Sequence, residues 1–385
     1  MSVSETDIRE ALRPVEDPEL HRSIVELGMY RGASIENGVV GLHIALTVAG
    51  CPLRSEIQRR VVDAVGALDG ITSVKVDFTV MTDTERAELR SKLRGHSSQA
   101  TPAGTQQSAA NAGRPAEGNS VPFSELGNRT RTLLVASGKG GVGKSSVTAN
   151  LAIALAAKGK STAVVDADVW GFSIPRMLGV DRPPVVIDDM IIPPEVHGVR
   201  CMSMGFFARE DQPVIWRGPM LHKALQQFLA DVYWNDPDYL LVDLPPGTGD
   251  ISLSLAQFLP RAEAYIVTTP NITAQKVAQR AAFMFQKVKI KVRGVIENMS
   301  WFTGDDGKRY HLFGSGGAAE LAECLGVELV GQVPLSIELR AGGDHGQPAM
   351  VSSPDSEASV ALTAIADWIE AQAPTRRTHP ELKVL

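Results

Sequence analysis

The chain has 385 residues, of which 44% are hydrophobic and 21% are charged, and its formal net charge is −6. This length is sufficient for two domains, and the acidic balance argues against the basic surface that nucleic-acid-binding proteins present. The three cysteines lie far apart, which excludes a disulfide framework and fits a reducing compartment. The polar N-terminus excludes a secretory signal, and no apolar run reaches the about 18 residues of a membrane span. We therefore expect a cytoplasmic protein that binds neither nucleic acid nor membrane.

Residues 1–95 have the pattern of a small α/β domain. Apolar residues alternate with other residues over 40–48 and again over 74–80, as they do in half-buried strands. Between these segments, 54–68 carries apolar residues at helical spacing on one face. We expect a compact unit of fewer than a hundred residues.

A change of composition separates this unit from the rest of the chain. Residues 97–120 contain no Val, Ile, Leu, Met or aromatic side chain. Such a segment cannot bury enough apolar surface to offset the entropy lost on ordering, so 96–128 is predicted to be a flexible linker. A large domain over 129–372 follows, and 373–385 forms a tail.

The large domain is predicted to be α/β, with a doubly wound, mostly parallel sheet. Its short apolar runs are typical of strands buried on both faces. They are TLLVA (132–136), TAVVD (162–166), YLLVD (239–243) and AYIVTT (264–269). Helical patterns alternate with them, as at 147–158 and 273–288, and this alternation indicates the doubly wound arrangement.

A glycine-rich loop, SGKGGVGKSS, lies between the first of these runs and a helix expected to be amphipathic, and it matches the P-loop pattern GxxxxGK[ST]. Glycines let backbone N–H groups approach phosphate oxygens, and the helix N-terminus adds its positive dipole end. We expect Lys144 to reach the β- and γ-phosphates of a nucleotide and the Ser145 hydroxyl to hold Mg²⁺. The predicted cradle comprises Gly138, Lys139, Gly140, Gly141, Val142, Gly143, Lys144, Ser145 and Ser146.

The second lysine of the loop, Lys139, has no role in an ordinary P-loop. With it, GKGGVGKS resembles the deviant Walker A motif of the family that includes MinD, ParA, the nitrogenase iron protein and the Mrp/ApbC proteins. The resemblance implies an ATP-sandwich homodimer in which Lys139 reaches the partner's nucleotide, as an arginine finger does. The alternative is a solvated loop lysine.

Acidic residues follow two of the predicted strands, at the sheet edge where open α/β proteins bind ligands. Asp243 resembles the Walker B carboxylate that holds Mg²⁺, and Gly247 resembles a glycine that senses the γ-phosphate. Asp168 is the candidate for positioning the attacking water or contacting Mg²⁺, with Asp166 beside it as a nucleotide contact. Both aspartates have a structural alternative, and for Asp166 it is the capping of a turn.

The same resemblance implies two contacts to the adenine base. Asn298, in VIENMS, follows a predicted strand, and its amide can donate to and accept from the base edge. Pro334, in GQVPL, follows the last predicted strand. The alternative for Asn298 is a cap at the strand end.

Longer segments resemble the Mrp/ApbC branch, which is associated with carrying iron–sulfur clusters. In the large domain they are DVWGFSIPRMLG (168–179), WRGPM (216–220) and DLPPGTGD (243–250). In the small domain, DPEL (17–20) and AGCPLRSEI (49–57) resemble a domain linked to iron–sulfur assembly. The two domains therefore point to the same biology.

The chain departs from that branch at the cluster ligands. Most Mrp-type carriers have a CxxC pair after ENMS, and four thiolates then bridge a cluster in the dimer. Here the corresponding residues, Gly304–Gly307, are predicted to form a turn. Cys324 lies in a helical pattern where we expect it to be packed, and Cys201 lies in a predicted strand. An iron–sulfur cluster therefore rests on the resemblance alone.

The remaining cysteine, Cys51, precedes Pro52, a residue suited to a first helical turn. Two interpretations stand side by side. A thiol at a helix N-terminus has its thiolate favoured by the helix dipole, which suits an iron–sulfur ligand or a reactive transfer site. In the other interpretation, Cys51 is a small buried thiol that fills a turn.

We expect a slow ATPase that uses ATP and Mg²⁺, forms a homodimer, and transfers iron–sulfur clusters to apoproteins or assists their assembly with assembly factors. One alternative is a nucleotide-dependent scaffold without its own cluster. Another is a positioning ATPase like MinD or ParA. The tail APTRRTHPELKVL has no amphipathic face for a membrane, and the acidic balance disfavours DNA, so both observations argue against the positioning role.

Overall fold

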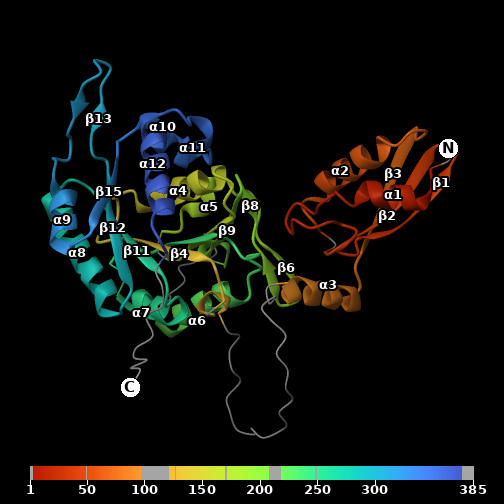
Figure 1. The fold of residues 1–385 in the computed structure, drawn as a ribbon, viewed down its shortest axis with the longest axis horizontal. Helices are drawn as coiled ribbons and strands as arrows, with labels where there is room; N and C mark the ends of the chain where they lie inside the picture. Colours follow the sequence, from red (N-terminus) through yellow and green to blue (C-terminus); the bar gives the residue numbers. More distant parts are fainter. Residues whose placement is uncertain are drawn as a thin grey trace, which may run out of the picture. The chain divides into compact units, whose positions relative to one another are not determined.

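The computed structural model describes residues 3–48, 50–96, 121–125, 127–169, 171–207, 218–247 and 249–374. The predicted linker residues 97–120 and tail residues 375–385 lie outside this range. Two compact units are present, and Figure 1 labels their elements. The first comprises Met1–Ala109 with Pro184–Pro193, and the second comprises Ala110–Pro183 with Pro194–Leu385.

The first unit is built on a three-stranded sheet in the order β1-β2-β3. Strands β1 and β2 are antiparallel, whereas β2 and β3 are parallel and are joined through α2. The unit contains α1 (Glu5–Leu12), β1 (Tyr30–Glu36), β2 (Val39–Leu46), α2 (Arg54–Gly66), β3 (Ser73–Val80), α3 (Asp83–His96), β6 (Val185–Ile187) and β7 (Met190–Ile192).

Its core confirms the periodicities read from the sequence. Alternate residues of β2, among them Val40 and Leu42, are fully buried. The α2 helix buries Ile57, Val61 and Val65, which lie four residues apart on one face. The α2 helix ends at Gly66, two residues before the predicted end. It ends early because the Leu68 N–H bonds to the Val65 carbonyl in a tighter, i to i−3 turn.

The second unit contains an eight-stranded sheet in the order β15-β12-β11-β4-β10-β5-β9-β8. Every neighbouring pair is parallel except β8 with β9 at one edge. All residues of β4, β5, β10 and β11 are buried, as the unbroken apolar runs predicted. The strands are β4 (Arg131–Ser137), β5 (Thr162–Asp166), β8 (Glu195–Val196), β9 (Val199–Ser203), β10 (Tyr239–Asp243), β11 (Glu263–Thr268), β12 (Lys291–Asn298) and β15 (Glu328–Val333).

Helices cover both faces of this sheet, so the predicted doubly wound fold is confirmed (Figure 1). One layer contains α4 (Lys144–Ala157), α5 (Ile174–Leu178), α10 (Ile337–His345), α11 (Ala349–Ser352) and α12 (Glu357–Ala371). The other contains α6 (Gly218–Ala230), α7 (Gly249–Phe258), α8 (Ile272–Lys287) and α9 (Gly317–Leu325). Short 3-10 helices lie at Pro122–Ser124 and Met204–Phe207, and a hairpin joins β13 (Phe302–Thr303) to β14 (Arg309–Tyr310).

The α4 helix differs from the prediction of an amphipathic helix. It is buried continuously from Val147 to Leu155, because α12, α5, α10 and α11 pack on the side that faces away from the sheet. The sequence indicates this burial, because no charged residue lies between Lys144 and Lys158. Among the described residues, no helix has the length and hydropathy needed to cross a bilayer.

Candidate nucleotide-binding site

The glycine-rich loop joins the C-terminal end of β4 to the N-terminus of α4. Gly141 and Gly143 have φ angles of +78° and +77°, a region that other residues rarely adopt. A Cβ atom on Gly138 would lie 2.3 Å from the backbone nitrogen of Ala278 in α8. A Cβ atom on Gly143 would lie 2.1 Å from the amide nitrogen of Asn298. Conformation and close packing therefore both require glycine in this loop.

A buried polar network lies at the start of α4. The Lys144 ammonium is 2.6 Å from Asp243 Oδ2, and the Ser145 hydroxyl donates to the same oxygen at 2.6 Å. The Thr148 hydroxyl donates to the other carboxylate oxygen, Asp243 Oδ1, at 2.7 Å. Lys144 is 6% exposed and Asp243 is fully buried, so neither charge is solvated by bulk water.

Thr148 was not predicted from the sequence. It lies one helical turn after Lys144 and is fully buried between the apolar residues Val147 and Ala149. Its hydroxyl lies 2.9 Å from the Lys144 carbonyl and 2.7 Å from Asp243 Oδ1. Because a carbonyl one turn earlier can satisfy a helical threonine, nothing in the local sequence indicates the carboxylate at the end of β10.

The oxygen atoms of this network fit a magnesium ion. Mg²⁺ prefers hard oxygen ligands and is usually bound through one or two carboxylate or hydroxyl groups together with substrate phosphates. The Ser145 Oγ and Asp243 Oδ2 atoms are 2.6 Å apart. They are the residues that would hold the ion beside Lys144.

Asp166 ends β5 and directs its carboxylate toward the start of α5. Its Oδ1 accepts the Asp168 N–H at 3.2 Å, and its Oδ2 accepts the N–H groups of Ser173 and Ile174 at 3.1 and 3.2 Å. The Ser203 hydroxyl also donates to Oδ2. These contacts favour the capping interpretation of Asp166. Burial, reinforced by the Asp243 carboxylate, raises the pKa of Asp166 to about 7.

Asp168 lies closer to the phosphate cradle. Its Oδ2 is 4.0 Å from the Lys144 ammonium, so two carboxylates, Asp168 and Asp243, flank the lysine. This placement is compatible with a group that orients water near the γ-phosphate. Gly247, in the loop after β10, has a φ of +84°, and its N–H donates to the Ser137 carbonyl at the end of β4. Its neighbour Thr248 and residues 216–217 of the WRGPM segment lie outside the described residues.

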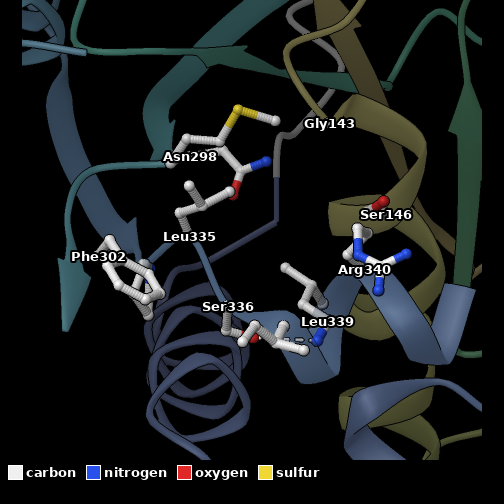
Figure 2. Close-up of a pocket in the computed structure, with 11 residues that line it drawn as sticks. Gly143, Ser146, Asn298, Phe302, Leu335, Ser336, Leu339 and Arg340 are labelled. Atoms are coloured by element: carbon white, nitrogen blue, oxygen red, sulfur yellow. Dashed lines mark hydrogen bonds between the residues drawn. The ribbon is translucent and has the colours of Figure 1, made fainter. Parts of the chain in front are cut away.

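A cavity of about 410 Å³ lies beside the loop, and both predicted base contacts, Asn298 and Pro334, line it (Figure 2). The Asn298 Nδ2 donates to the Val142 carbonyl at 2.9 Å, which fixes the orientation of the amide. Its Oδ1 is buried and has no hydrogen-bond partner. A largely apolar pocket with one unsatisfied acceptor suits a planar base that carries an amino group. The other lining residues are Gly143, Ser146, Met299, Phe302, Leu335, Ser336, Ile337, Leu339 and Arg340.

The Lys139 side chain is exposed on the loop, and its carbonyl accepts the Ser137 hydroxyl at 3.0 Å. This backbone contact holds the start of the loop while the ammonium extends into solvent. Its role toward a partner subunit stays a prediction.

Two expectations about the cysteines need correction. Cys324 is exposed rather than packed, because α9 buries Leu321, Ala322 and Leu325 on the opposite face. Its sulfur lies 2.8 Å from Gln279 Nε2. Pro52 lies in the turn before α2, which begins at Arg54, so Pro52 is not in the first helical turn.

The remaining thiols lie in different environments. Cys51 is partly buried, three residues before α2, and its carbonyl accepts the Arg54 N–H. Cys201 is fully buried in β9, as its strand pattern predicted, and burial raises the pKa of its thiol. The turn predicted at Gly304–Gly307 is present and closes the β13–β14 hairpin. No three His, Cys, Asp or Glu side chains of the described residues are grouped to hold a metal ion.

Comparison with known proteins gives two family matches. The description "NUBPL iron-transfer P-loop NTPase" matches residues 128–370, and "iron–sulfur cluster assembly protein" matches residues 5–78. An iron–sulfur cluster carrier protein of Mycobacterium leprae is 46% identical over 94% of this chain and 91% of its own length. Proteins of the same name from Synechocystis and Bacillus subtilis are 41% and 37% identical, over 93% and 86% of this chain and 94% and 88% of their own lengths.

Among solved structures, a nucleotide-binding protein from Archaeoglobus fulgidus in complex with ADP is similar to this chain with a TM-score of 0.51. It is 34% identical and covers 63% of this chain and 91% of its own. The family match over residues 128–370 includes the glycine-rich loop.

Proposed function

This chain belongs to the iron–sulfur cluster carrier family of P-loop NTPases, and from that premise we propose that it binds and hydrolyses ATP to drive the transfer of iron–sulfur clusters. The observation that carries the proposal is the buried Lys144–Asp243–Ser145 network at the N-terminus of α4. Buried titratable side chains cluster at functional sites, and this pair lies at a loop whose glycines and helix N-terminus suit a phosphate.

Each group in the network has a role in phosphoryl transfer. The backbone N–H groups of the glycine-rich loop and the positive end of α4 bind the phosphates. Ser145 and Asp243 would hold the metal, which when bound would neutralise charge on the phosphate oxygens. Lys144, which here pairs with Asp243, would bind the β- and γ-phosphates of the nucleotide. The network is therefore a resting arrangement that nucleotide binding rearranges.

Hydrolysis requires an oriented water and stabilisation of charge in the transition state. Asp168, 4.0 Å from Lys144, is placed to accept a hydrogen bond from water near the γ-phosphate. Lys139 supplies its charge to the nucleotide of a second copy, so the active form is a dimer. Gly247, whose N–H donates to the Ser137 carbonyl at the end of β4, is the residue of the loop after β10 that senses the γ-phosphate.

The cluster is cargo in this proposal. Its ligands differ from a CxxC site, because the three cysteines at positions 51, 201 and 324 form no such pair. This observation favours a second candidate, a nucleotide-dependent scaffold that binds apoproteins or assembly factors without holding a cluster. Cys201 is fully buried in β9 and belongs to no group of three metal-ligating side chains among the residues that the structure describes.

Two assays test these functions. Phosphate release from ATP with Mg²⁺ should occur in wild type and be lost in Lys144→Ala. Lys139→Ala should keep ATP binding while losing hydrolysis. Anaerobic reconstitution with iron and sulfide should give cluster absorbance in wild type and less of it in Cys51→Ala, whereas the scaffold predicts none in either. An absence of phosphate release in wild type would contradict the ATPase proposal.

A further inference from the structure

The β13–β14 hairpin has one side chain in the cavity beside the glycine-rich loop. Phe302, the first residue of β13, lines this cavity and lies opposite Tyr310 of β14. In Figure 2 the Phe302 ring lies on one side of the pocket and the Leu339 and Arg340 side chains lie on the other. A planar group in the pocket would therefore have an aromatic ring within reach.

The residues on either side of Phe302 are both bound by one carboxylate. Glu357, the first residue of α12, accepts the Trp301 indole N–H at 3.0 Å and the Thr303 hydroxyl at 2.7 Å. It also accepts the guanidinium of Arg309, which lies opposite Thr303 in the hairpin. Because successive side chains of a strand point to opposite faces, the bond from Thr303 to Glu357 on one face directs the adjacent Phe302 to the other face, where it lines the cavity.

Further contacts hold the hairpin beside the pocket. The Arg309 guanidinium lies 4.2 Å from the centre of the Trp301 ring, so two of the three residues that bind Glu357 also contact each other. The Leu335 N–H donates to the Trp301 carbonyl at 2.7 Å, and the Ser300 N–H donates to the Val333 carbonyl. These bonds join the base of the hairpin to the segment that supplies Pro334 and Leu335 to the pocket.

From these contacts we propose that Phe302 is a base-contacting residue of the nucleotide site and that Glu357 is the positioning residue that holds it there. The ligand is the purine base of a nucleotide whose phosphates bind the glycine-rich loop, so the inference rests on the proposed function. Because the same hairpin residues bind Glu357 and flank Phe302, base binding and the position of the hairpin are coupled.

Binding of ADP and of inorganic pyrophosphate, each with Mg²⁺, separates the base from the phosphates. In Phe302→Ala the dissociation constant for ADP should rise about tenfold, the scale of base–aromatic stacking, and that for pyrophosphate should stay within about twofold. Glu357→Ala should also raise the dissociation constant for ADP more than that for pyrophosphate. Glu357→Gln should recover part of the loss, because an amide oxygen still accepts from Trp301 and Thr303.

Hydrogen exchange distinguishes a positioning role of Glu357 from a contribution to stability alone, because only the positioning role makes protection of the hairpin depend on the base. In wild type, ADP should slow exchange of the hairpin amides over 301–311 and pyrophosphate should not, and Glu357→Ala should remove this difference. The matched controls are Phe313→Ala and Glu320→Gln, an exposed aromatic residue and an exposed acid outside the pocket, and both should behave as wild type.

The outcomes separate this inference from the function on which it rests. An unchanged ratio of ADP to pyrophosphate affinity in Phe302→Ala would overturn the inference alone. If wild type binds neither ligand, both the inference and the proposed function fail. If Phe302→Ala binds neither because it is misfolded, Phe302→Leu keeps the apolar volume without the ring and should show the same selective loss of ADP. Equal affinity of that variant and wild type for ADP would also overturn the inference.

Discussion

Replacing Lys144 by Met tests the buried ion pair in the metal-free, nucleotide-free protein. The ammonium and the Asp243 carboxylate are 2.6 Å apart, with 6% and 0% of their side chains exposed. Removal of one partner of such a pair leaves a buried charge, a change that typically costs 3–5 kcal/mol. The Ser145 and Thr148 hydroxyls still donate to Asp243, so we expect a loss near the lower end, about 3 kcal/mol.

Adding Asp243→Asn to Lys144→Met removes the orphaned charge, and the double variant should return to within about 1 kcal/mol of wild type. Urea unfolding in the presence of EDTA, followed by tryptophan fluorescence, measures this, because all five Trp residues lie beyond position 129 in the large domain. Lys158→Met, at the C-terminal cap of the same helix, is the matched control. Its partners, Asp367 and Glu370, are more exposed, so it should cost under about 1 kcal/mol. Equal stability of Lys144→Met and wild type would refute the reasoning.

Three further predictions follow from the same contacts. Gly138→Ala places a Cβ atom 2.3 Å from the Ala278 backbone and should lower the free energy of unfolding by about 2 kcal/mol or more, as thermal or urea unfolding would show. Burial and the Asp243 carboxylate raise the pKa of Asp166 to about 7, so the folded chain keeps a proton that the unfolded chain releases near pH 4. The free energy of unfolding of the metal-free protein should therefore fall as pH rises from about 4 to about 7, and Asp166→Asn should lack this part of the slope; a slope identical to wild type would argue against it. Removal of Mg²⁺ by EDTA should weaken ATP binding at least about tenfold, measured by equilibrium dialysis, and an unchanged affinity would contradict a contribution of the metal to ATP binding.

Local features of the site were predictable because they are encoded in consecutive residues. The glycines and Lys144 lie within one loop, and the flanking strand and helix are marked by their apolar patterns. The observed β4 and α4 lie where these patterns placed them. Asn298 and Pro334 became candidates only through resemblance, since their meeting in one cavity depends on the order of β12 and β15 in the sheet.

The missed residues depend on contacts between segments far apart in the sequence. Phe302 and Glu357 are 55 positions apart, and nothing in either local sequence shows that α12 begins beside the hairpin. The burial of α4 depends likewise on α12, which packs against it from the end of the chain. Cys324 was misjudged although the helical spacing already separates it from the buried stripe of α9. That stripe contains Leu321 and Leu325, whereas Cys324 lies on the side of Glu320.

The central claim is that the glycine-rich loop and Lys144 form a nucleotide site. Equilibrium dialysis of the full chain against ATP with Mg²⁺ tests it most directly. The account predicts saturable binding of one ATP per chain in wild type and loss of that binding in Lys144→Ala. No saturable binding in wild type, or undiminished binding in Lys144→Ala, would contradict it.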